Sequence, residues 1–584
     1  MSTSPRTPQP TAPQPTPQPT APKSTPTARQ VADRWVETLA DLDPTVGTAL
    51  GIRPGDDRMP DLSPSALAAR ADAARAALAE LETAEVVDED DRRCAALMRE
   101  RLGAHLLVHD TGEDLVSLRP IGSPVQGLQS LFLMMPTATV DDWAVIARRM
   151  ARVPESAESY RLSLAAGIER GLLSAPRQAE AVVEQLTAWL PSEAPGWHTS
   201  FVTAKDDAPD LPESLQGDLR RAAEQAAKGV AALRDWISRT YLPAVAAVPD
   251  GVRRERYLVA ARAATGADID PEEAYAWGWT ELGRIEDEMV QEAERVLPGA
   301  TPAQALAHLE EHGPAVEGVE EVRGWLQALM DRAIADLDGT VVDIAQPVKR
   351  VEAMIAPPGA AAAPYYTRPS LDFSRPGRTW LPTLGRTRFP TWDLISTWYH
   401  EGVPGHHLQL GQWAYRANEL SRFQVSVGSV AATTEGWALY AERLVDELGY
   451  LTDPGARIGY LDGQRMRAVR VVIDIGMHLG LLIPTTAPFH PGEVWTAELG
   501  EEFFAARSGA SSAYVHSEIV RYLGWPGQAI SYKLGERAWL AGRVAARARR
   551  EAAGEAFDLR AWHTAALSLG SLGLDDLERE LSAL

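Results

Sequence analysis

Histidines are the side chains in this sequence best placed to do chemistry. The 584-residue chain has 12 of them, and three lie in the segment His400-Glu401-Gly402-Val403-Pro404-Gly405-His406-His407. A catalytic zinc ion takes three protein ligands, often His, His and Glu, and leaves one position open for water. A glutamate beside the first histidine can remove a proton from that water. The segment therefore predicts a hydrolytic zinc site with His400 as a ligand and Glu401 as general base.

The second histidine ligand is either His406 or His407. The familiar H-E-x-x-H motif places its histidines one helical turn apart, but Pro404 occupies that position here. A helix should end or kink at Pro404-Gly405, and the distorted turn would return one histidine to the ion. On a straight helix, His407 would lie about 10 Å beyond His400 at ~1.5 Å per residue. The alternative is that these histidines cap a helix end and bond to backbone carbonyls.

Glu435 is the predicted third ligand. It lies seven residues before Glu442, so both carboxylates share one face of a helix that also carries Trp437 and Tyr440. Carboxylates on a largely apolar helix are costly unless they are paired or bind a cation. An exposed acidic face with Arg443 close by is the alternative.

Two further groups of polar residues indicate a polar site among helices. Arg470, Asp474 and His478 recur every four positions on a helix of Val, Ile, Met and Leu, which predicts a buried hydrogen-bonded network. His478 as a direct metal ligand is the less favoured interpretation. The network should support the site from within the core.

The second group supplies candidate substrate contacts. A hydroxyl from Tyr522 or Tyr532 facing the zinc would stabilise the oxyanion of a tetrahedral intermediate, and Arg521 would hold a substrate carboxylate. An extended peptide would pair with the edge of a short strand around Trp380. Core tyrosines beside a salt-bridged arginine are the alternative for these residues.

The elements that must position these groups are mostly helices. Apolar residues recur at helical spacing up to about residue 337, most clearly over residues 215–237. Alternation and Pro-Gly breaks over residues 340–383 predict a small antiparallel sheet. We predict a mainly α fold with three regions: a disordered Pro/Thr-rich tail over residues 1–28, a helical region over 29–340 and a catalytic region over 341–584.

Composition limits the partners and the compartment. Asp and Glu number 80 against 57 Lys and Arg, a net charge of -23, which disfavours nucleic acid and anionic membranes. The single cysteine, Cys94, suits a reducing compartment and cannot form a thiolate metal cluster. No apolar stretch has the length or purity of a transmembrane helix or a signal peptide. We therefore expect a soluble cytoplasmic protein that binds neither nucleic acid nor membranes.

The chain also resembles the family called domain of unknown function 885, which is grouped with the zincin-like metallopeptidases. The resemblance runs from about Ala28 to near the C-terminus. It is carried mainly by the split motif over residues 400–407 and by Glu435-Gly436-Trp437-Ala438. It implies a zincin-like helical body with a deep cleft. It also implies His400, one of the two later histidines and Glu435 as ligands.

These observations predict a zinc-dependent hydrolase that cleaves peptide bonds, with one ion per chain. Other divalent transition metals also suit nitrogen and oxygen ligands. An amidase acting on a small non-peptide metabolite is a second hypothesis, and a catalytically inactive helical binding scaffold is a third. Serine or cysteine nucleophile chemistry is disfavoured because no G-x-S-x-G element occurs. Substrate length and oligomeric state stay open.

Overall fold

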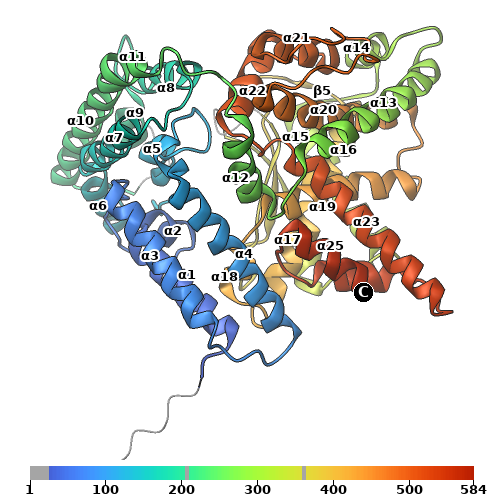
Figure 1. Ribbon diagram of the computed structural model, residues 1–584, viewed down its shortest axis with the longest axis horizontal. Coiled ribbons are helices and arrows are strands. Elements are labelled where there is room, and N and C mark those ends of the chain that lie inside the picture. The colour runs from blue at the N-terminus through green and yellow to red at the C-terminus, as the bar shows by residue number, and fades with distance from the viewer. Residues whose placement is uncertain (1–24, 204–208, 358–362) are drawn as a thin grey trace, which may run out of the picture.

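The structure is a computed structural model that describes residues 25–203, 209–357 and 363–584. Most of the predicted N-terminal tail, residues 1–24, lies outside the described residues. The mainly helical class is confirmed, and among the described residues short strands interrupt the helices only near the middle of the chain (Figure 1).

The first helices follow directly from local sequence rules. Thr27 closes a capping box with Gln30 at the start of the first helix. Pro64 occupies the first turn of the third, where a missing N–H costs nothing. This group comprises α1 (Ala28–Leu42), α2 (Pro44–Ala49), α3 (Pro64–Leu81), α4 (Glu89–Thr111) and the 3-10 helix η1 (Glu113–Val116).

The next helices form a lobe with its own apolar core, at the upper left of Figure 1. The predicted helix over residues 215–237 is present as α10 and the start of a π-helical turn, and Pro243 lies in the first turn of the short helix that follows. The lobe comprises α5 (Pro124–Leu133), α6 (Val140–Met150), α7 (Val153–Arg170), α8 (Pro176–Ala188), α9 (Trp197–Thr203), α10 (Glu213–Trp236), η2 (Ile237–Tyr241) and α11 (Leu242–Val245).

The middle of the chain returns to the main body and carries the strands. Its helical elements are α12 (Arg253–Thr265), α13 (Pro271–Val296), α14 (Pro302–His312), α15 (Val319–Leu337) and the 3-10 helix η3 (Gln346–Lys349). Its strands are β1 (Ala315–Glu317), β2 (Val351–Ile355), β3 (Tyr365–Thr367), β4 (Gly377–Leu381) and β5 (Arg388–Pro390).

The predicted small sheet exists, but its pairing is mixed. The strands lie in the order β2-β4-β3, with β3 antiparallel to β4, and a separate antiparallel pair joins β1 to β5. The pairing of β2 with β4 is parallel, with Ala353 opposite Thr379. The prediction of antiparallel pairing is wrong for these two strands, because the chain visits β3 on the far edge before it returns to form β4.

The remaining helices build the right-hand part of Figure 1 and carry most of the predicted site. They are α16 (Thr391–Glu401), α17 (His406–Tyr415), α18 (Arg422–Val425), α19 (Ala431–Glu447), α20 (Pro454–Leu479), α21 (Ala497–Ser508), α22 (Ser512–Gly524), α23 (Ser531–Ala552), α24 (Leu559–Leu567) and α25 (Leu574–Ala583).

One large apolar core holds the main body together. It includes side chains from both ends of the described chain, from Ala28 on the first helix to Leu581 on the last. The predicted regions on either side of residue 340 therefore share one core. Burial of this apolar surface is the principal force that brings the distant segments together.

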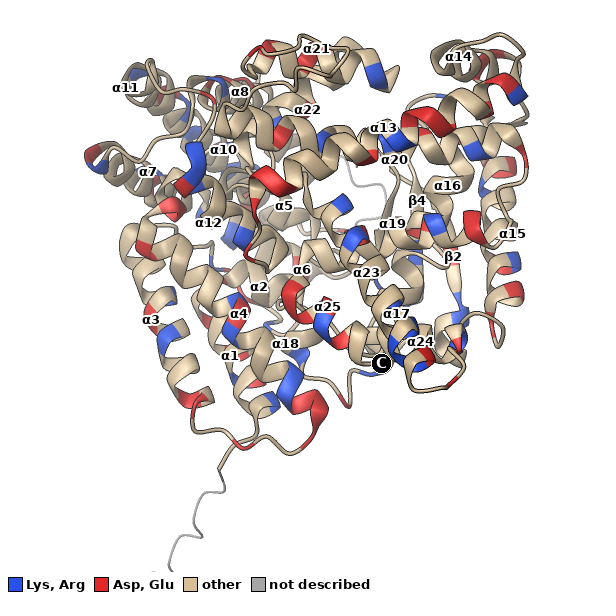
Figure 2. Ribbon diagram, turned by 45° about the vertical axis from the view of Figure 1, so that its right-hand side comes forward, with Lys and Arg blue, Asp and Glu red and all other residues tan. Residues whose placement is uncertain are grey.

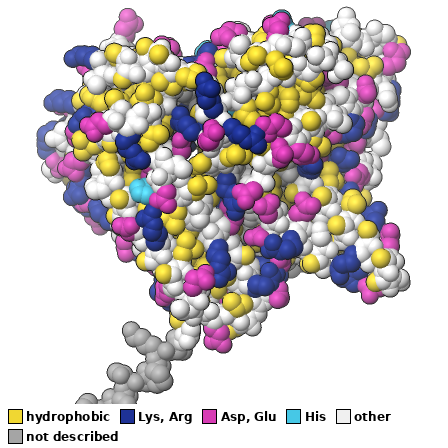
Figure 3. Space-filling view, in the orientation of Figure 1, with side chains coloured by type: hydrophobic (Ala, Val, Ile, Leu, Met, Phe, Trp, Pro, Cys, Tyr) yellow, Lys and Arg dark blue, Asp and Glu magenta, His cyan; other side chains and the backbone are white. Residues whose placement is uncertain are grey.

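Charges of both signs are interspersed over the surface (Figures 2 and 3). None of the helices in the described residues combines the length and apolar character needed to cross a bilayer.

Candidate metal centre

A tight turn between α16 and α17 brings His406 back beside His400. Helix α16 ends at Glu401, and the N–H of Gly405 then donates to the carbonyl of Tyr399 over 2.9 Å. A β-carbon at Gly405 would overlap the carbonyl of His400, so only glycine permits this approach. The two imidazole rings come to rest with their centroids 4.8 Å apart and nearly perpendicular.

Trp437 on α19 holds this turn from the other side. Its indole N–H donates to the carbonyls of Pro404 and Gly405, over 2.9 and 3.1 Å. Buried backbone carbonyls need such partners, because an unpaired one loses its hydrogen bonds to water. The Glu-Gly-Trp segment therefore both supplies a carboxylate and fixes the histidine turn.

Glu435 completes a set of three converging donors. Its Oε2 lies 3.5 Å from Nε2 of His400 and 3.6 Å from Nε2 of His406. One ligand atom from each residue falls within 4.8 Å of the other two. Zinc with bonds of about 2.0–2.1 Å in a tetrahedron requires ligand atoms roughly 3.4 Å apart. The three residues therefore fit a zinc ion without large rearrangement.

Glu442 orients His400 from behind. Its Oε1 accepts a 2.7 Å hydrogen bond from Nδ1 of His400, and its Oε2 accepts another of 2.7 Å from Ser396. This directs Nε2 of His400 toward Glu435, and once Nε2 is deprotonated it can bind a metal ion in that position. Glu442 is only 1 % exposed. The alternative of an exposed acidic face on α19 is therefore wrong.

The charges of this cluster shift one another's pKa values. Burial opposes a positive charge on His400, but Glu435 and Glu442 outweigh burial and raise the pKa of His400 to about 9. Burial likewise opposes a negative charge on Glu435, but His400 and His406 outweigh it and hold the pKa of Glu435 well below its usual range. Without a metal ion, the cluster is a partly buried ion pair.

Helix α19 packs so closely on α23 that their backbones touch at Gly436. A β-carbon at Gly436 would overlap the backbone of Gly535, and one at Gly535 would overlap the carbonyl of Ala432. The two helices run side by side in Figure 1. This contact sets the position of Glu435 relative to Tyr532, which lies on α23 three residues before Gly535.

His407 has a different role, and the alternative that makes it the second ligand does not fit. Its Nε2 donates to the carbonyl of Val348 over 2.7 Å, so its Nδ1 accepts from the hydroxyl of Tyr366 over 3.0 Å. Burial lowers the pKa of His407 to about 4, which keeps the ring neutral. A β-carbon at Gly377 would overlap the Tyr366 hydroxyl. His407 thus ties α17 to η3 and the sheet.

The three donors open into a cavity of about 660 Å³. Glu401 lines it, and the Glu401 carboxylate has no hydrogen-bond or ion-pair partner among the described residues. Burial raises the pKa of Glu401. Tyr532 lines the same cavity, and the carboxylate of Glu435 is the main reason that the pKa of Tyr532 is raised. The predicted base and one predicted hydroxyl therefore lie at the donor set.

Arg521 and Tyr522 do not line this cavity. The Tyr522 hydroxyl donates to Oε2 of Glu518 over 2.5 Å and accepts from Arg470 over 2.8 Å. Arg521 binds Glu518 and the side-chain oxygen of Gln528. Their predicted contacts with substrate would require these hydrogen bonds to break.

Trp380 reaches the cavity only through a neighbour. Its ring stacks on Tyr365, which does line the cavity, with centroids 5.8 Å apart. Its indole N–H donates to Thr367 across the β3–β4 pair over 3.0 Å. Trp380 therefore supports the strand that faces the site.

The predicted polar network on α20 is buried and hydrogen-bonded. Asp474 accepts from the hydroxyl of Tyr257 over 2.7 Å and from the N–H of Gly527 over 3.0 Å. Both ring nitrogens of His478 bond to backbone atoms, one to Val252 and the other to Tyr522. His478 is therefore not placed as a ligand.

Sequence reasoning did not single out two arginines that line the cavity. Arg467 lies 3.9 Å from Glu442, and its Nε is buried without a hydrogen-bond partner. Arg368 donates to the carbonyl of Val425 and the hydroxyl of Ser429, and no described carboxylate pairs with it. Arg467 could have been found from its spacing, one helical turn before Arg470.

Comparisons with known proteins place the chain in a family and a fold. Residues 44–581 match the family described as "Bacterial protein of unknown function (DUF885)". The structure resembles a "putative lipoprotein" from Colwellia psychrerythraea, with a TM-score of 0.80, 21% identity, and 95% of this chain and 99% of that chain covered. It also resembles a "putative lipoprotein of unknown function" from Shewanella oneidensis, with a TM-score of 0.70 and 16% identity, and again 95% of this chain and 99% of that chain are covered. A search of curated proteins gave no significant match.

Proposed function

This chain belongs to the bacterial DUF885 family of unknown function, and we propose that it is a zinc-dependent hydrolase of peptide or related amide bonds. The observation that carries the proposal is the convergence of His400, His406 and Glu435, whose ligand atoms lie within 4.8 Å of one another at the wall of a cavity. The zincin-like fold and the cytoplasmic location belong to the same proposal.

A zinc ion held by these three residues would act as a Lewis acid and lower the pKa of a bound water toward ~7. Glu401 would remove the proton from the attacking water, because its carboxylate lines the cavity without a partner. Its raised pKa suits a group that must first take a proton and then give it up. Glu401 would next protonate the leaving amine.

Tyr532 would stabilise the negative charge that develops on the carbonyl oxygen. Its hydroxyl has no hydrogen-bond partner among the described residues, and its ring packs against the guanidinium of Arg470, 5.1 Å from the ring centre. A hydroxyl held in a buried cavity can donate a hydrogen bond that strengthens as the oxyanion forms. Of the two predicted tyrosines, Tyr532 is the one we favour for this role.

The cavity also favours a substrate that carries a negative charge. Arg368 and Arg467 both line it, and both keep N–H groups that no described carboxylate occupies at short distance. A guanidinium group can bind a carboxylate through two parallel hydrogen bonds. These two arginines are better placed than Arg521 to hold a terminal carboxylate.

Metal analysis together with one substitution tests the proposal. Protein purified without added metal should contain one zinc ion per chain, and a panel of dipeptides, longer peptides and acylated amines should reveal a substrate class. Glu401→Gln should keep the zinc but lose about 10³-fold in turnover, since general acid–base catalysis contributes about 10² to 10⁴-fold. Glu311→Gln, an exposed change on α14, is the matched control.

Two outcomes would reject parts of this proposal. Unchanged turnover in Glu401→Gln would rule out its role as base. Absence of stoichiometric zinc, together with melting that a chelator does not alter, would favour the inactive scaffold. Cleavage of acylated amines but not of peptides would favour the amidase.

A further inference from the structure

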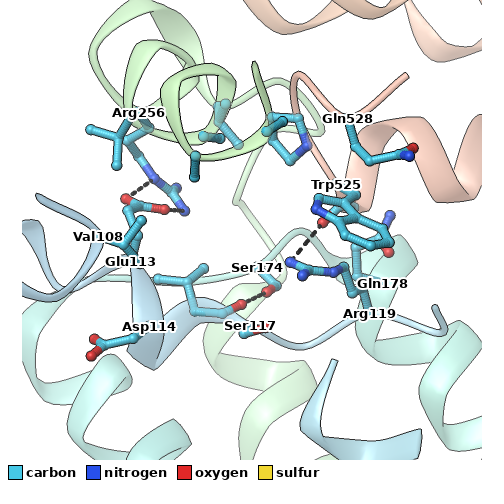
Figure 4. Close-up of a pocket in the computed structure, with 18 of the residues that line it drawn as sticks. Val108, Glu113, Asp114, Ser117, Arg119, Ser174, Gln178, Arg256, Trp525 and Gln528 are labelled. Carbon is cyan, nitrogen blue, oxygen red and sulfur yellow. Dashed lines mark hydrogen bonds and ion pairs between the residues drawn. The ribbon is translucent and has the colours of Figure 1, made fainter. Parts of the chain in front are cut away.

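A second cavity lies where the first helices and the lobe meet the main body (Figure 4). Its volume is about 490 Å³, which is within the range of small-molecule sites. Its walls come from α3, α4, η1, α8 and α12, and from the segment around Trp525. It shares no lining residue with the metal cavity. The two are neighbours, because Ser429 on its wall accepts a hydrogen bond from Arg368 of the metal cavity.

Most of the charges in this cavity neutralise one another. Arg256 and Glu113 form a two-bond ion pair of 2.7 and 3.0 Å, visible on one side of Figure 4. Asp114 bonds to His109 over 2.6 Å. Arg101 and Asp250 also line the cavity and pair with residues outside it, whereas Arg70 on the wall donates only to the backbone carbonyl of Asp61. Among the described residues, these pairs leave the guanidinium groups of Arg70 and Arg119 without a carboxylate partner.

Like Arg70, Arg119 has no carboxylate among the described residues within ion-pair distance. It lies against the ring of Trp525, with its central carbon 4.8 Å from the ring centre (Figure 4). Burial lowers the pKa of the Arg119 guanidinium to about 10. The Arg119 side chain is half-buried, and a partly desolvated cation without a counterion gains by binding an anion.

The hydrogen bonds of Arg119 leave a pair of donors free. Its Nε donates to the carbonyl of Ile121 over 3.1 Å, its Nη2 to Gly122 over 2.6 Å and its Nη1 to Gly524 over 3.5 Å. A guanidinium group has five N–H groups. One N–H therefore remains on each of Nη1 and Nη2, and these two atoms together match the two oxygens of a carboxylate.

The rest of the wall is mainly apolar. Apolar side chains of α12 and the preceding loop form one side, and the indole of Trp525 lies beside Arg119 on another. The hydroxyl of Ser117 lines the cavity and has no hydrogen-bond partner among the described residues. A ligand that fits must combine one anionic group with a body that gains by leaving water.

We propose that this cavity binds a small molecule that carries a carboxylate on an apolar body. The carboxylate binds Nη1 and Nη2 of Arg119, and the apolar body lies along α12. The site does not depend on the metal centre, and it holds its ligand at the junction of the lobe and the main body.

A matched pair of probes tests the site. 4-Phenylbutyrate and 4-phenylbutan-1-ol differ in the charged group and share the apolar body. Calorimetric titration of the full chain should show the carboxylate binding at least about tenfold more tightly than the alcohol, because charge-assisted hydrogen bonds are the stronger ones. Arg119→Gln should remove that preference, and Arg119→Lys should retain part of it. Arg239→Gln, at an exposed arginine of η2, should bind like the parent.

Each of the other results would overturn the proposal. Equal binding of the two probes by the parent would show that Arg119 recognises no anion. Inorganic phosphate binding as tightly as 4-phenylbutyrate would show that the apolar wall contributes nothing. Loss of binding in Glu435→Gln, with retention in Arg119→Gln, would move the site to the metal cavity. Circular dichroism checks that the Arg119 variants fold. If Arg119→Gln does not fold, the comparison of the two probes is made with Arg119→Lys alone.

Discussion

Two buried polar networks in this molecule look alike in the sequence and differ in space. The histidine network consists of Ser396, His400, His406, Glu435 and Glu442. The arginine network consists of Arg470, Asp474, His478, Glu518 and Tyr522. Each combines imidazole and carboxylate groups on apolar helices. Only the first leaves three electron-pair donors aimed at one point beside a cavity.

The difference lies in how each histidine uses its two nitrogens. His400 uses one ring nitrogen in a hydrogen bond to Glu442, and its other ring nitrogen faces Glu435. Both ring nitrogens of His478 are hydrogen-bonded to backbone groups. Both ring nitrogens of His407 are likewise hydrogen-bonded, one to the carbonyl of Val348 and the other to the hydroxyl of Tyr366. A buried polar group must be satisfied, and a fully satisfied one supports the fold. The group that stays incompletely satisfied beside a cavity is the one available for chemistry.

Two adjacent histidines give the sharpest way to break this comparison. His406→Ala should abolish zinc binding with little loss of stability. His407→Ala should keep the zinc and lower the free energy of unfolding by on the order of 3 kcal/mol, because it leaves Val348 and Tyr366 without partners. Elemental analysis and denaturant unfolding measure the two effects. The reverse pattern would exchange the roles of the two residues.

Glu442→Gln should weaken zinc binding by about 10 to 100-fold without abolishing it, because the amide oxygen can still accept from His400 while the negative charge is lost. Competition with a chelating dye gives the dissociation constant. Glu447→Gln is the control, because Glu447 lies on the same helix and pairs with Arg543 instead of His400. Equal weakening in both variants would mean that Glu442 acts only through general electrostatics.

Asp474→Asn tests the arginine network through pH. Burial raises the pKa of Asp474 to about 7. The folded state then holds a proton that the unfolded state releases near pH 4, so this contribution to stability is present at pH 4 and is lost as pH rises to 7. The loss is on the order of 4 kcal/mol, at about 1.4 kcal/mol for each pH unit between 4 and 7. Asp474→Asn should remove this fall in denaturant unfolding measured across pH and leave zinc binding intact. An unchanged pH profile would contradict it.

The number of protons released when zinc binds is a further difference between the two networks. His400, with its pKa raised to about 9, carries a proton at pH 7 in the metal-free protein and must lose it to bind zinc. The pKa of His478 is lowered to about 4, so its ring is already neutral at pH 7 and has no extra proton to release. Calorimetric zinc titrations in buffers of different ionisation enthalpy should therefore report about one proton released at pH 7. No dependence on the buffer would exclude a charged His400.

Local rules were enough to predict much of the fold and part of the candidate site. The end of α16 at Glu401 follows from Pro404, and the shared face of Glu435 and Glu442 follows from helical periodicity. The choice between His406 and His407 does not follow, because it depends on how the turn over residues 402–405 packs under Trp437. That contact joins segments 33 residues apart.

The substrate-contact residues were harder to predict for a similar reason. Periodicity marks Arg521 and Tyr522 as polar positions on α22, but it cannot say that Glu518, one turn earlier, satisfies both. Tyr532 reaches the metal cavity because its helix, α23, packs against α19, and this contact cannot be read from periodicity. The parallel pairing of β2 with β4 also depends on a tertiary choice, the edge on which β3 is placed.

The contact between Gly436 and Gly535 fixes the separation of α19 and α23 beside the candidate metal centre. No side chain lies between α19 and α23 at this level, so the spacing from Glu435 to Tyr532 cannot drift when core residues around it are exchanged. Substitutions in the surrounding core and in the cavity wall should therefore leave the spacing of Glu435 and Tyr532 unchanged.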